Sequence, residues 1–333
     1  MRLPALVTAF LCAGLGLAQA DSVAEFYRGK TITALVGVSA GGEYDFQLRL
    51  VARHLGKHIP GNPNIIPQNM TGATGLVMAN YLYKVAPKDG TYIGLIQNGL
   101  PTSQAVGLEG VQFDARQFQW LGSASPSTIT IFTWKDNVKT IEEAKRTQVI
   151  TGAVGSSGIT LSFPMMLNDL LGTKFKMVIG YTGSGAIDLA MERGEVSARV
   201  SSFASLKTSK PNWISDRLVN FLVYSGPQTA ELAHVPSVSD LITQAEDREV
   251  AQIVGTSDLL GHPFATAPGV PQERVDALRK AFQDMLRDPD YVKEASARGL
   301  SINPVDAATL TQTINTAISA TDAAKQRARK YFQ

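Results

Sequence analysis

The sequence has little of the chemistry that catalysis or disulfide bonding requires. Its 333 residues include one cysteine and four histidines, and aromatic residues make up only 8%. Charged residues amount to 18%, and the formal net charge of +2 is close to neutral. No basic stripe with interleaved aromatic residues is present, so nucleic acid is not an expected partner. The hydrophobic content of 44% is that of an ordinary globular protein.

The amino terminus carries the one long apolar run. Arg2 gives it a positive start, residues 3–17 are almost wholly apolar, and the residues before Asp21 end in the small-x-small pattern that signal peptidase cuts. We therefore expect residues 1–20 to be a signal peptide that is cleaved after Ala20 during export. The run is shorter than the roughly 20 residues of a spanning helix, so we expect a protein that does not itself span a membrane.

The single cysteine, Cys12, falls inside this predicted signal peptide. Leu11 precedes it where lipid attachment would need a small residue, so we expect no lipid anchor. Cleavage leaves a mature chain with neither a disulfide nor a thiol nucleophile, which fits an exported protein held together by its core alone. The remaining length of roughly 310 residues favours two domains over one.

A glycine-rich turn is used twice, each time between an apolar strand-like run and a helical pattern. The first copy is Val36–Asp45 (VGVSAGGEYD), and the second is Ile150–Thr160 (ITGAVGSSGIT). Where a strand feeds through such a turn into a helix, unpaired backbone N–H groups and the positive end of the helix dipole point into the turn. Both turns therefore favour an anion. Their pairing suggests two lobes that close on one anionic small molecule.

Strands alternate with helices along the chain, which predicts an α/β fold of parallel or mixed sheets covered by helices. Such sheets bind ligands at the carboxyl ends of their strands, where both glycine turns lie. The predicted strands are Thr31–Val38, Ile65–Gln68, Thr91–Ile96, Thr128–Trp134, Val149–Ala153, Lys176–Ile179 and Val196–Ser201, and the predicted helices are Asp45–Lys57, Leu76–Val85, Thr140–Lys145, Leu161–Leu171, Ala186–Glu192 and Gln272–Arg298.

Two extended stretches that end in small residues and proline, Leu121–Pro126 and Leu222–Pro227, are interpreted as the two crossovers of a hinge. The middle of the chain then forms one lobe, and its two ends together form the other. The helix predicted near the carboxyl end is expected to pack on the first lobe. The predicted bounds are 21–122 and 227–333 for lobe 1 and 123–226 for lobe 2.

Several chemistries are disfavoured by their motifs. Ser156 and Ser157 do not lie in a Gly-x-Ser-x-Gly elbow, and neither turn has the Gly-x-Gly-x-x-Gly pattern or a Walker lysine. His54 and His58 are four residues apart, but the residues between them supply no acid for zinc-protease chemistry. We therefore expect no catalytic residues, no metal and no cofactor, and we rank an exported enzyme acting on carboxylates below a binding protein.

A series of motifs then resembles one known family, the Bug receptors, which are the solute-binding proteins of tripartite tricarboxylate transporters. The resemblance covers nearly all of the chain after the signal peptide, with the motifs in the family's order. The motifs are GGEYD at 41–45 followed by Leu48-Arg49, PQNMTGA at 67–73, APKDGT at 86–91, GSSG at 155–158, GYTGSG at 180–185 followed by GEV at 194–196, and APGVP at 267–271.

The resemblance implies a type II periplasmic binding protein, a Venus flytrap of two α/β lobes that closes over an organic carboxylate in the periplasm. The ligand would be a dicarboxylate, a tricarboxylate or an aromatic carboxylate, and the partners would be the integral-membrane permease subunits of the transporter. A monomer is expected. The ligand-binding residues so implied are Ala40, Gly41, Gly42, Glu43, Tyr44, Gln97, Asn98, Ser156, Ser157, Gly158, Ile159, Thr160, Thr182, Gly183, Ser184, Ser202 and Phe203.

Some positions depart from the family pattern or have a structural interpretation. Glu43 would disfavour a bare anion, so it fits a ligand with a hydroxyl, an amine or a bound cation. Asp45 is expected to accept backbone N–H groups at the start of a helix, and Arg49 is expected to pair with it. Phe163 suggests a more apolar wall. A periplasmic sensor that presents the same carboxylate to a two-component histidine kinase stays open as an alternative.

Overall fold

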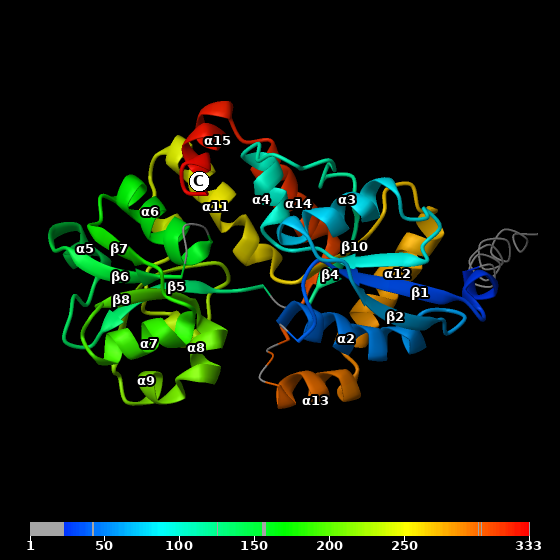
Figure 1. Ribbon diagram of the computed structural model, residues 1–333, viewed down its shortest axis with the longest axis horizontal. Coiled ribbons are helices and arrows are strands. Elements are labelled where there is room, and N and C mark those ends of the chain that lie inside the picture. The colour runs from blue at the N-terminus through cyan, green and yellow to red at the C-terminus, as the bar shows by residue number, and fades with distance from the viewer. Residues whose placement is uncertain are drawn as a thin grey trace, which may run out of the picture.

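The computed structural model describes residues 23–41, 43–124, 126–154, 158–298, 300 and 302–332. Within them the chain forms two lobes, each built on one β-sheet with helices on both faces (Figure 1). The predicted two-lobed α/β fold is thereby observed. The predicted signal peptide and its cleavage site lie outside the described residues and stay a prediction. No helix in the described part of the chain combines the length and the apolar character needed to cross a membrane.

The first lobe contains a six-stranded sheet with the strand order β11-β4-β10-β3-β1-β2. Strand β1 is parallel to β2 and β3, whereas β10 is antiparallel to β3 and β4. Ile32, Ala34 and Val36 point to one face, and Leu35 points to the other, as the two-residue period of a strand requires. The strands are β1 (Thr31–Val36), β2 (Asn64–Asn69), β3 (Tyr92–Leu95), β4 (Gln119–Ser123), β10 (Pro263–Thr266) and β11 (Val305–Asp306).

The second lobe contains a five-stranded sheet with the order β7-β6-β8-β5-β9. Its strands are β5 (Ile129–Trp134), β6 (Val149–Ala153), β7 (Phe175–Ile179), β8 (Ala198–Ser202) and β9 (Val219–Ser225). Strand β6 is parallel to β7 and β8, but β5 is antiparallel to β8 and β9. Both sheets are therefore mixed.

Helices cover both faces of each sheet, and four large apolar clusters fill the layers between them. The long helices are α2 (Glu43–Leu55), α3 (Leu76–Lys84), α6 (Ile159–Leu171), α7 (Ser184–Glu192), α11 (Ala245–Leu260), α12 (Gln272–Leu286), α13 (Pro289–Ala297), α14 (Ala307–Ile318) and α15 (Asp322–Arg329). The shorter helices are α4 (Leu100–Ala105), α5 (Ile141–Arg146), α8 (Phe203–Ser209), α9 (Pro211–Ser215) and α10 (Val238–Leu241), with single 3₁₀ turns at Gly56–His58, Ala73–Gly75 and Ala230–Leu232.

The structure contains two helices where the sequence predicted one. The sequence pattern predicted a continuous helix over Gln272–Arg298, but the structure divides it into α12 and α13. Pro289 has no N–H to continue the helical hydrogen bonds, and Asp288 accepts a hydrogen bond from the Asp290 N–H as the cap of a new helix. As predicted, both helices pack on the first lobe, next to α2.

The segment between β4 and β5 runs beside the residues that follow β9. The Thr128 hydroxyl donates to the Pro227 carbonyl over 2.6 Å, so the segments run side by side. Gly226 has a φ of +98°, and a Cβ built on it would lie 2.5 Å from the Ser127 carbonyl oxygen. Only glycine allows the segment after β9 to approach the segment before β5 this closely.

The C-terminal end of the chain also reaches the second lobe. Arg327 on α15 donates to Asp169 on α6 at 2.8 Å, and α15 packs on α11. This contact links the last helix, which the predicted bounds assign to lobe 1, to the second lobe. The bounds themselves stay a prediction.

Candidate functional site

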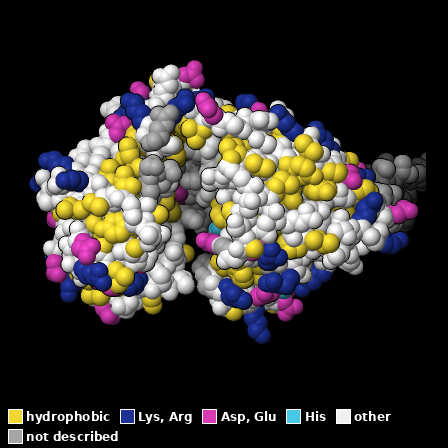
Figure 2. Space-filling view, in the orientation of Figure 1, with side chains coloured by type: hydrophobic (Ala, Val, Ile, Leu, Met, Phe, Trp, Pro, Cys, Tyr) yellow, Lys and Arg dark blue, Asp and Glu magenta, His cyan; other side chains and the backbone are white. Residues whose placement is uncertain are grey.

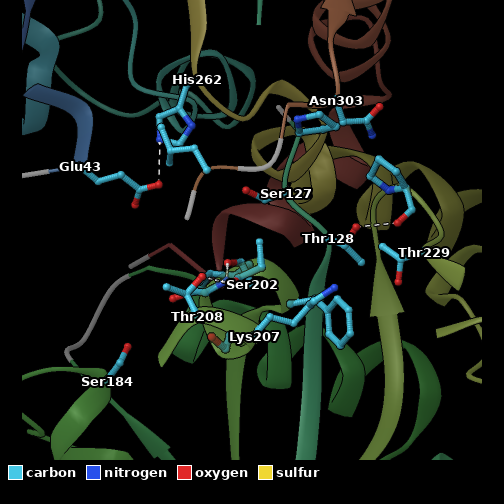
Figure 3. Close-up of a pocket in the computed structure, with 18 of the residues that line it drawn as sticks. Glu43, Ser127, Thr128, Ser184, Ser202, Lys207, Thr208, Thr229, His262 and Asn303 are labelled. Carbon is cyan, nitrogen blue, oxygen red and sulfur yellow. Dashed lines mark hydrogen bonds and ion pairs between the residues drawn. The ribbon is translucent and has the colours of Figure 1, made fainter. Parts of the chain in front are cut away.

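A cavity of about 860 Å³ lies between the two lobes. In the space-filling view it is the hollow that separates them (Figure 2). The start of α2 and the residues around His262 line it from the first lobe, and the starts of α6, α7 and α8 line it from the second. The segment between β4 and β5 contributes Ser127 and Thr128, and the residues after β9 contribute Thr229 (Figure 3). Motion of one lobe against the other would therefore change the shape of this cavity.

The first glycine turn is braced by the acid that follows it. Asp45 accepts hydrogen bonds from the Gly41 N–H at 2.8 Å and from the Asn69 amide at 2.9 Å. Arg49, one helical turn along α2, donates to the same carboxylate at 2.9 Å. The Arg49 guanidinium lowers the pKa of the Asp45 carboxyl to about 2. These are the contacts expected of Asp45 and Arg49 from their spacing, and they fix the direction in which the turn faces the cavity.

A second acid of the first turn meets a histidine from a distant part of the chain. Glu43, the first residue of α2, places its carboxylate 3.5 Å from His262 Nε2, and its side chain is 65% exposed (Figure 3). Behind this pair the Tyr44 ring packs on the His262 ring at a centroid distance of 4.6 Å. The His262 Nδ1 atom is buried and has no hydrogen-bond partner in the described structure. Burial lowers the pKa of His262, against the opposing charge of Glu43.

The second lobe presents the beginnings of two helices to the cavity. Ile159 and Thr160 open α6, and the Thr160 hydroxyl accepts a hydrogen bond from the Val154 N–H at 3.2 Å, which closes the turn. Ser184 opens α7, and its carbonyl accepts a hydrogen bond from Arg199 at 3.0 Å. The first N–H groups of a helix have no partner inside it. These two starts therefore supply donors on the side of the cavity that faces α2.

The end of β8 adds a third polar edge. Ser202 caps α8 by accepting a hydrogen bond from the Ser205 N–H at 3.1 Å. Phe203 is buried, and the Lys207 ammonium lies 5.7 Å from the centre of its ring. Lys207 also forms an ion pair with Glu231. This cation is thus already neutralised where it borders the cavity.

The predicted site residues divide into three groups. Those that line the cavity are Gly41, Glu43, Asp45, Arg49, Ile159, Thr160, Ser184, Ser202 and Phe203. Those described elsewhere than in its lining are Ala40, Tyr44, Gln97, Asn98, Gly158, Thr182 and Gly183. Gly42, Ser156 and Ser157 lie outside the described residues.

Several of the second group have structural contacts. The Tyr44 hydroxyl donates to the Gly261 carbonyl at 3.4 Å and accepts from the Asn98 N–H at 3.2 Å. The Asn98 side chain donates to the Ser257 carbonyl at 2.9 Å, which ties it to α11. Gln97 packs against Gly75, where a Cβ would fall 1.5 Å from its Oε1 atom. Tyr44, Gln97 and Asn98 therefore make contacts within the first lobe and do not line the cavity.

The expectation about Phe163 is wrong. Its side chain is 1% exposed and belongs to the apolar core between the second sheet, α6 and α11. It is not among the described residues that line the cavity. The helix turns this position inward because an apolar ring is stabilised in the core. Phe163 therefore gives no support to an aromatic ligand.

The sequence did not indicate several residues that line the cavity, namely Ser127, Thr128, Lys207, Thr208, Thr229, Glu231, His262, Arg298 and Asn303. The segment before β5 was predicted to be a crossover, and a crossover beside a cleft is a reason to expect lining residues. The histidine and Arg298 carried no local signal, because only the folded chain brings them to α2.

His54 and His58 each contact an acidic side chain from a later part of the chain. His54 contacts Glu294 at 2.8 Å and His58 contacts Asp288 at 2.9 Å, so each histidine links α2 or the turn after it to the helices near the carboxyl end. Among the residues that the structure describes, no cluster of three histidine, cysteine, aspartate or glutamate side chains is arranged to hold an ion.

No protein-family model matches the chain. Over 281 residues it is 27% identical to the UPF0065 protein in the TAR-I ttuE-ttuC' intergenic region of Agrobacterium vitis, which covers 82% of this chain and 76% of that protein. A TctC solute binding protein from Polaromonas, solved with no ligand, has a TM-score of 0.72 at 19% identity and covers 91% of this chain and 99% of that one.

The periplasmic binding protein BugD has a TM-score of 0.58 at 19% identity, with 92% of this chain and 98% of that one covered. In fold the chain is similar to BugD, as the resemblance to the Bug receptors implied. MatC from Rhodopseudomonas palustris, solved with bound malate, also has a TM-score of 0.58, at 16% identity, with 90% and 98% covered. The fold is thus that of the two-lobed type II periplasmic binding proteins. The TctC protein and BugD are named as binding proteins and not as enzymes, in agreement with the lack of a catalytic motif in the sequence.

Proposed function

We propose that this protein is a periplasmic receptor that captures an organic carboxylate between its lobes and delivers it to the membrane subunits of a tripartite tricarboxylate-type transporter. The observation that carries the proposal is the cavity between the lobes, lined by the starts of α2 and α6 directly after the two glycine turns. Malate, a dicarboxylate, is bound in a structure with the same fold. The sensor alternative has no observation of its own in its favour.

The physical basis is electrostatic. Each helix start offers backbone N–H groups without helical partners, together with the positive end of a helix dipole. Oriented N–H groups bind a carboxylate through charge-assisted hydrogen bonds and immobilise no long side chain. Because the two starts belong to different lobes, one carboxylate that contacts both would favour the closed arrangement over the open one.

A thermal-shift screen tests the receptor function. The protein recovered from the periplasm of a Gram-negative host is heated with aliphatic dicarboxylates, tricarboxylates and aromatic carboxylates near neutral pH. A ligand at a hundred times its Kd adds about 2.7 kcal/mol to the free energy of unfolding, which raises the melting temperature measurably. We expect one class of acid to give this rise. If no carboxylate does, the proposal fails.

The role of the backbone is tested at Ile159, the first residue of α6. Proline is tolerated at the first position of a helix, so Ile159→Pro removes one N–H donor and leaves the helix intact. We expect this variant to lose at least tenfold in affinity for the acid found in the screen. Ile159→Ala keeps the N–H and serves as the control for the lost side chain. Isothermal titration of both variants measures the difference, and equal losses would show that the side chain and not the N–H binds the ligand.

A further inference from the structure

The carboxylates that line the cavity are not equivalent. Among the described lining residues they are Glu43, Asp45 and Glu231. Asp45 is neutralised by Arg49 at 2.9 Å, and Glu231 is neutralised by Lys207. No lysine or arginine of the described chain forms an ion pair with Glu43. It is the lining carboxylate whose negative charge stays available to a ligand.

The partner of Glu43 does not cancel this charge. His262 lies 3.5 Å away and is buried in the first lobe, with the Tyr44 ring against it and its Nδ1 atom unpartnered. Burial lowers the pKa of His262 and so disfavours the imidazolium form that would neutralise this carboxylate. The contact with His262 orients the Glu43 side chain toward the cavity, as the close-up shows, and leaves its charge in place (Figure 3).

A cation of the same lobe lies beside α2. The Arg298 guanidinium stacks 5.1 Å above the centre of the Phe46 ring, and both residues line the cavity. Phe46 stands three residues after Glu43, so the two are neighbours on one face of the helix. In the described part of the chain no carboxylate pairs with Arg298. Within its described residues, the first lobe therefore presents to the cavity one carboxylate and one guanidinium that form no ion pair with an oppositely charged side chain of the lysine, arginine, aspartate or glutamate type.

We propose that the ligand is a carboxylate that also carries an ammonium group, and that Glu43 receives this group while the helix starts and Arg298 face the carboxylate. The proposal rests on the receptor function given above and names its substrate class. A plain dicarboxylate held beside Glu43 would meet a like charge in a cleft that excludes water on closing. An ammonium in the same place forms a charge-assisted hydrogen bond.

Matched ligand pairs test the proposal. Each pair has one carbon skeleton, with hydrogen or an ammonium at C2: succinate and aspartate, glutarate and glutamate, adipate and 2-aminoadipate, phenylacetate and phenylglycine. For the skeleton that binds best, we expect isothermal titration to show the ammonium form at least tenfold tighter. Glu43→Gln, of equal size but without charge, should remove most of this preference and bind the unsubstituted acid at least as tightly as the wild type does.

Glu231→Gln is the control, because it removes an equal charge from the same cavity at a carboxylate that already has a cationic partner. It should leave the ratio of the two affinities unchanged. Unsubstituted acids that bind as tightly as their amino forms, or a ratio that survives in Glu43→Gln, would overturn the inference while the receptor function stands. If neither member of any pair binds and the broader acid screen is also negative, both proposals fail.

Discussion

Replacing Asp188 with alanine is expected to lower the free energy of unfolding by about 3–5 kcal/mol, because it leaves a buried guanidinium without its counter-ion. Asp188 on α7 forms an ion pair with Arg199 on β8, and their side chains are 5% and 1% exposed. Burial raises the pKa of Asp188, and the charge of Arg199 opposes that rise. Arginine does not lose its proton in a protein, so the charge stays buried when the acid is removed. Urea unfolding followed by circular dichroism measures the loss.

The double variant Asp188→Leu with Arg199→Met is the matched control. It removes both charges and fills much the same volume, so it should lose about 1 kcal/mol or less. A loss as large as that of the single variant would show that packing, and not the unpaired charge, is responsible. Arg199 also holds the Ser184 carbonyl at the edge of the cavity, so Asp188→Ala should weaken ligand binding as well.

Asp258→Asn is expected to stabilise the protein at alkaline pH and to flatten its pH dependence. The Asp258 side chain is 3% exposed near the end of α11, and burial raises its pKa to about 8. Its carbonyl accepts a hydrogen bond from the Ser127 N–H of the first crossover at 2.7 Å. Between pH 4 and 8 the folded state therefore keeps a proton that the unfolded state has released. Stability falls as pH rises through this window, by up to about 1.4 kcal/mol per pH unit.

The asparagine variant carries no proton to lose, so its free energy of unfolding should change less between pH 5 and 8 and exceed that of the wild type at pH 9. Urea unfolding at one-unit pH intervals gives both slopes. Asp136→Asn, at an exposed position of the second lobe, should keep the slope of the wild type. Parallel slopes for the wild type and Asp258→Asn would mean that Asp258 is ionised in the folded protein.

Much of the fold follows from local sequence. The strand runs at Thr31–Val36 and Val149–Ala153 and the helices that follow them lie where the alternation of apolar runs and glycine turns predicts. The antiparallel direction of the other strands was not predictable from the same pattern. Short runs such as Pro263–Thr266 contain too few residues to show a period, and their direction depends on which strand lies beside them in the folded sheet.

The site divides in a similar way. Asp45 and Arg49 are one helical turn apart, so their contact follows from spacing. Gln97 and Asn98 follow a strand, as lining residues often do. In the structure, however, the Gln97 side chain packs against Gly75, and the Asn98 side chain donates a hydrogen bond to the Ser257 carbonyl. The orientation of a side chain after a strand depends on what packs beside it, and the sequence alone does not contain that information.

By itself the sequence determined two units, each of a strand, a glycine turn and a helix, and with them the helix starts whose backbone N–H groups have no helical partner. These depend on backbone geometry and on residues a few positions apart. Only the tertiary structure decided that His262 meets Glu43, that Arg298 stacks on Phe46 and that Phe163 turns into the core. Contacts between distant segments are set by how the sheets pack and where the two crossovers place one lobe against the other, and no local pattern encodes that geometry.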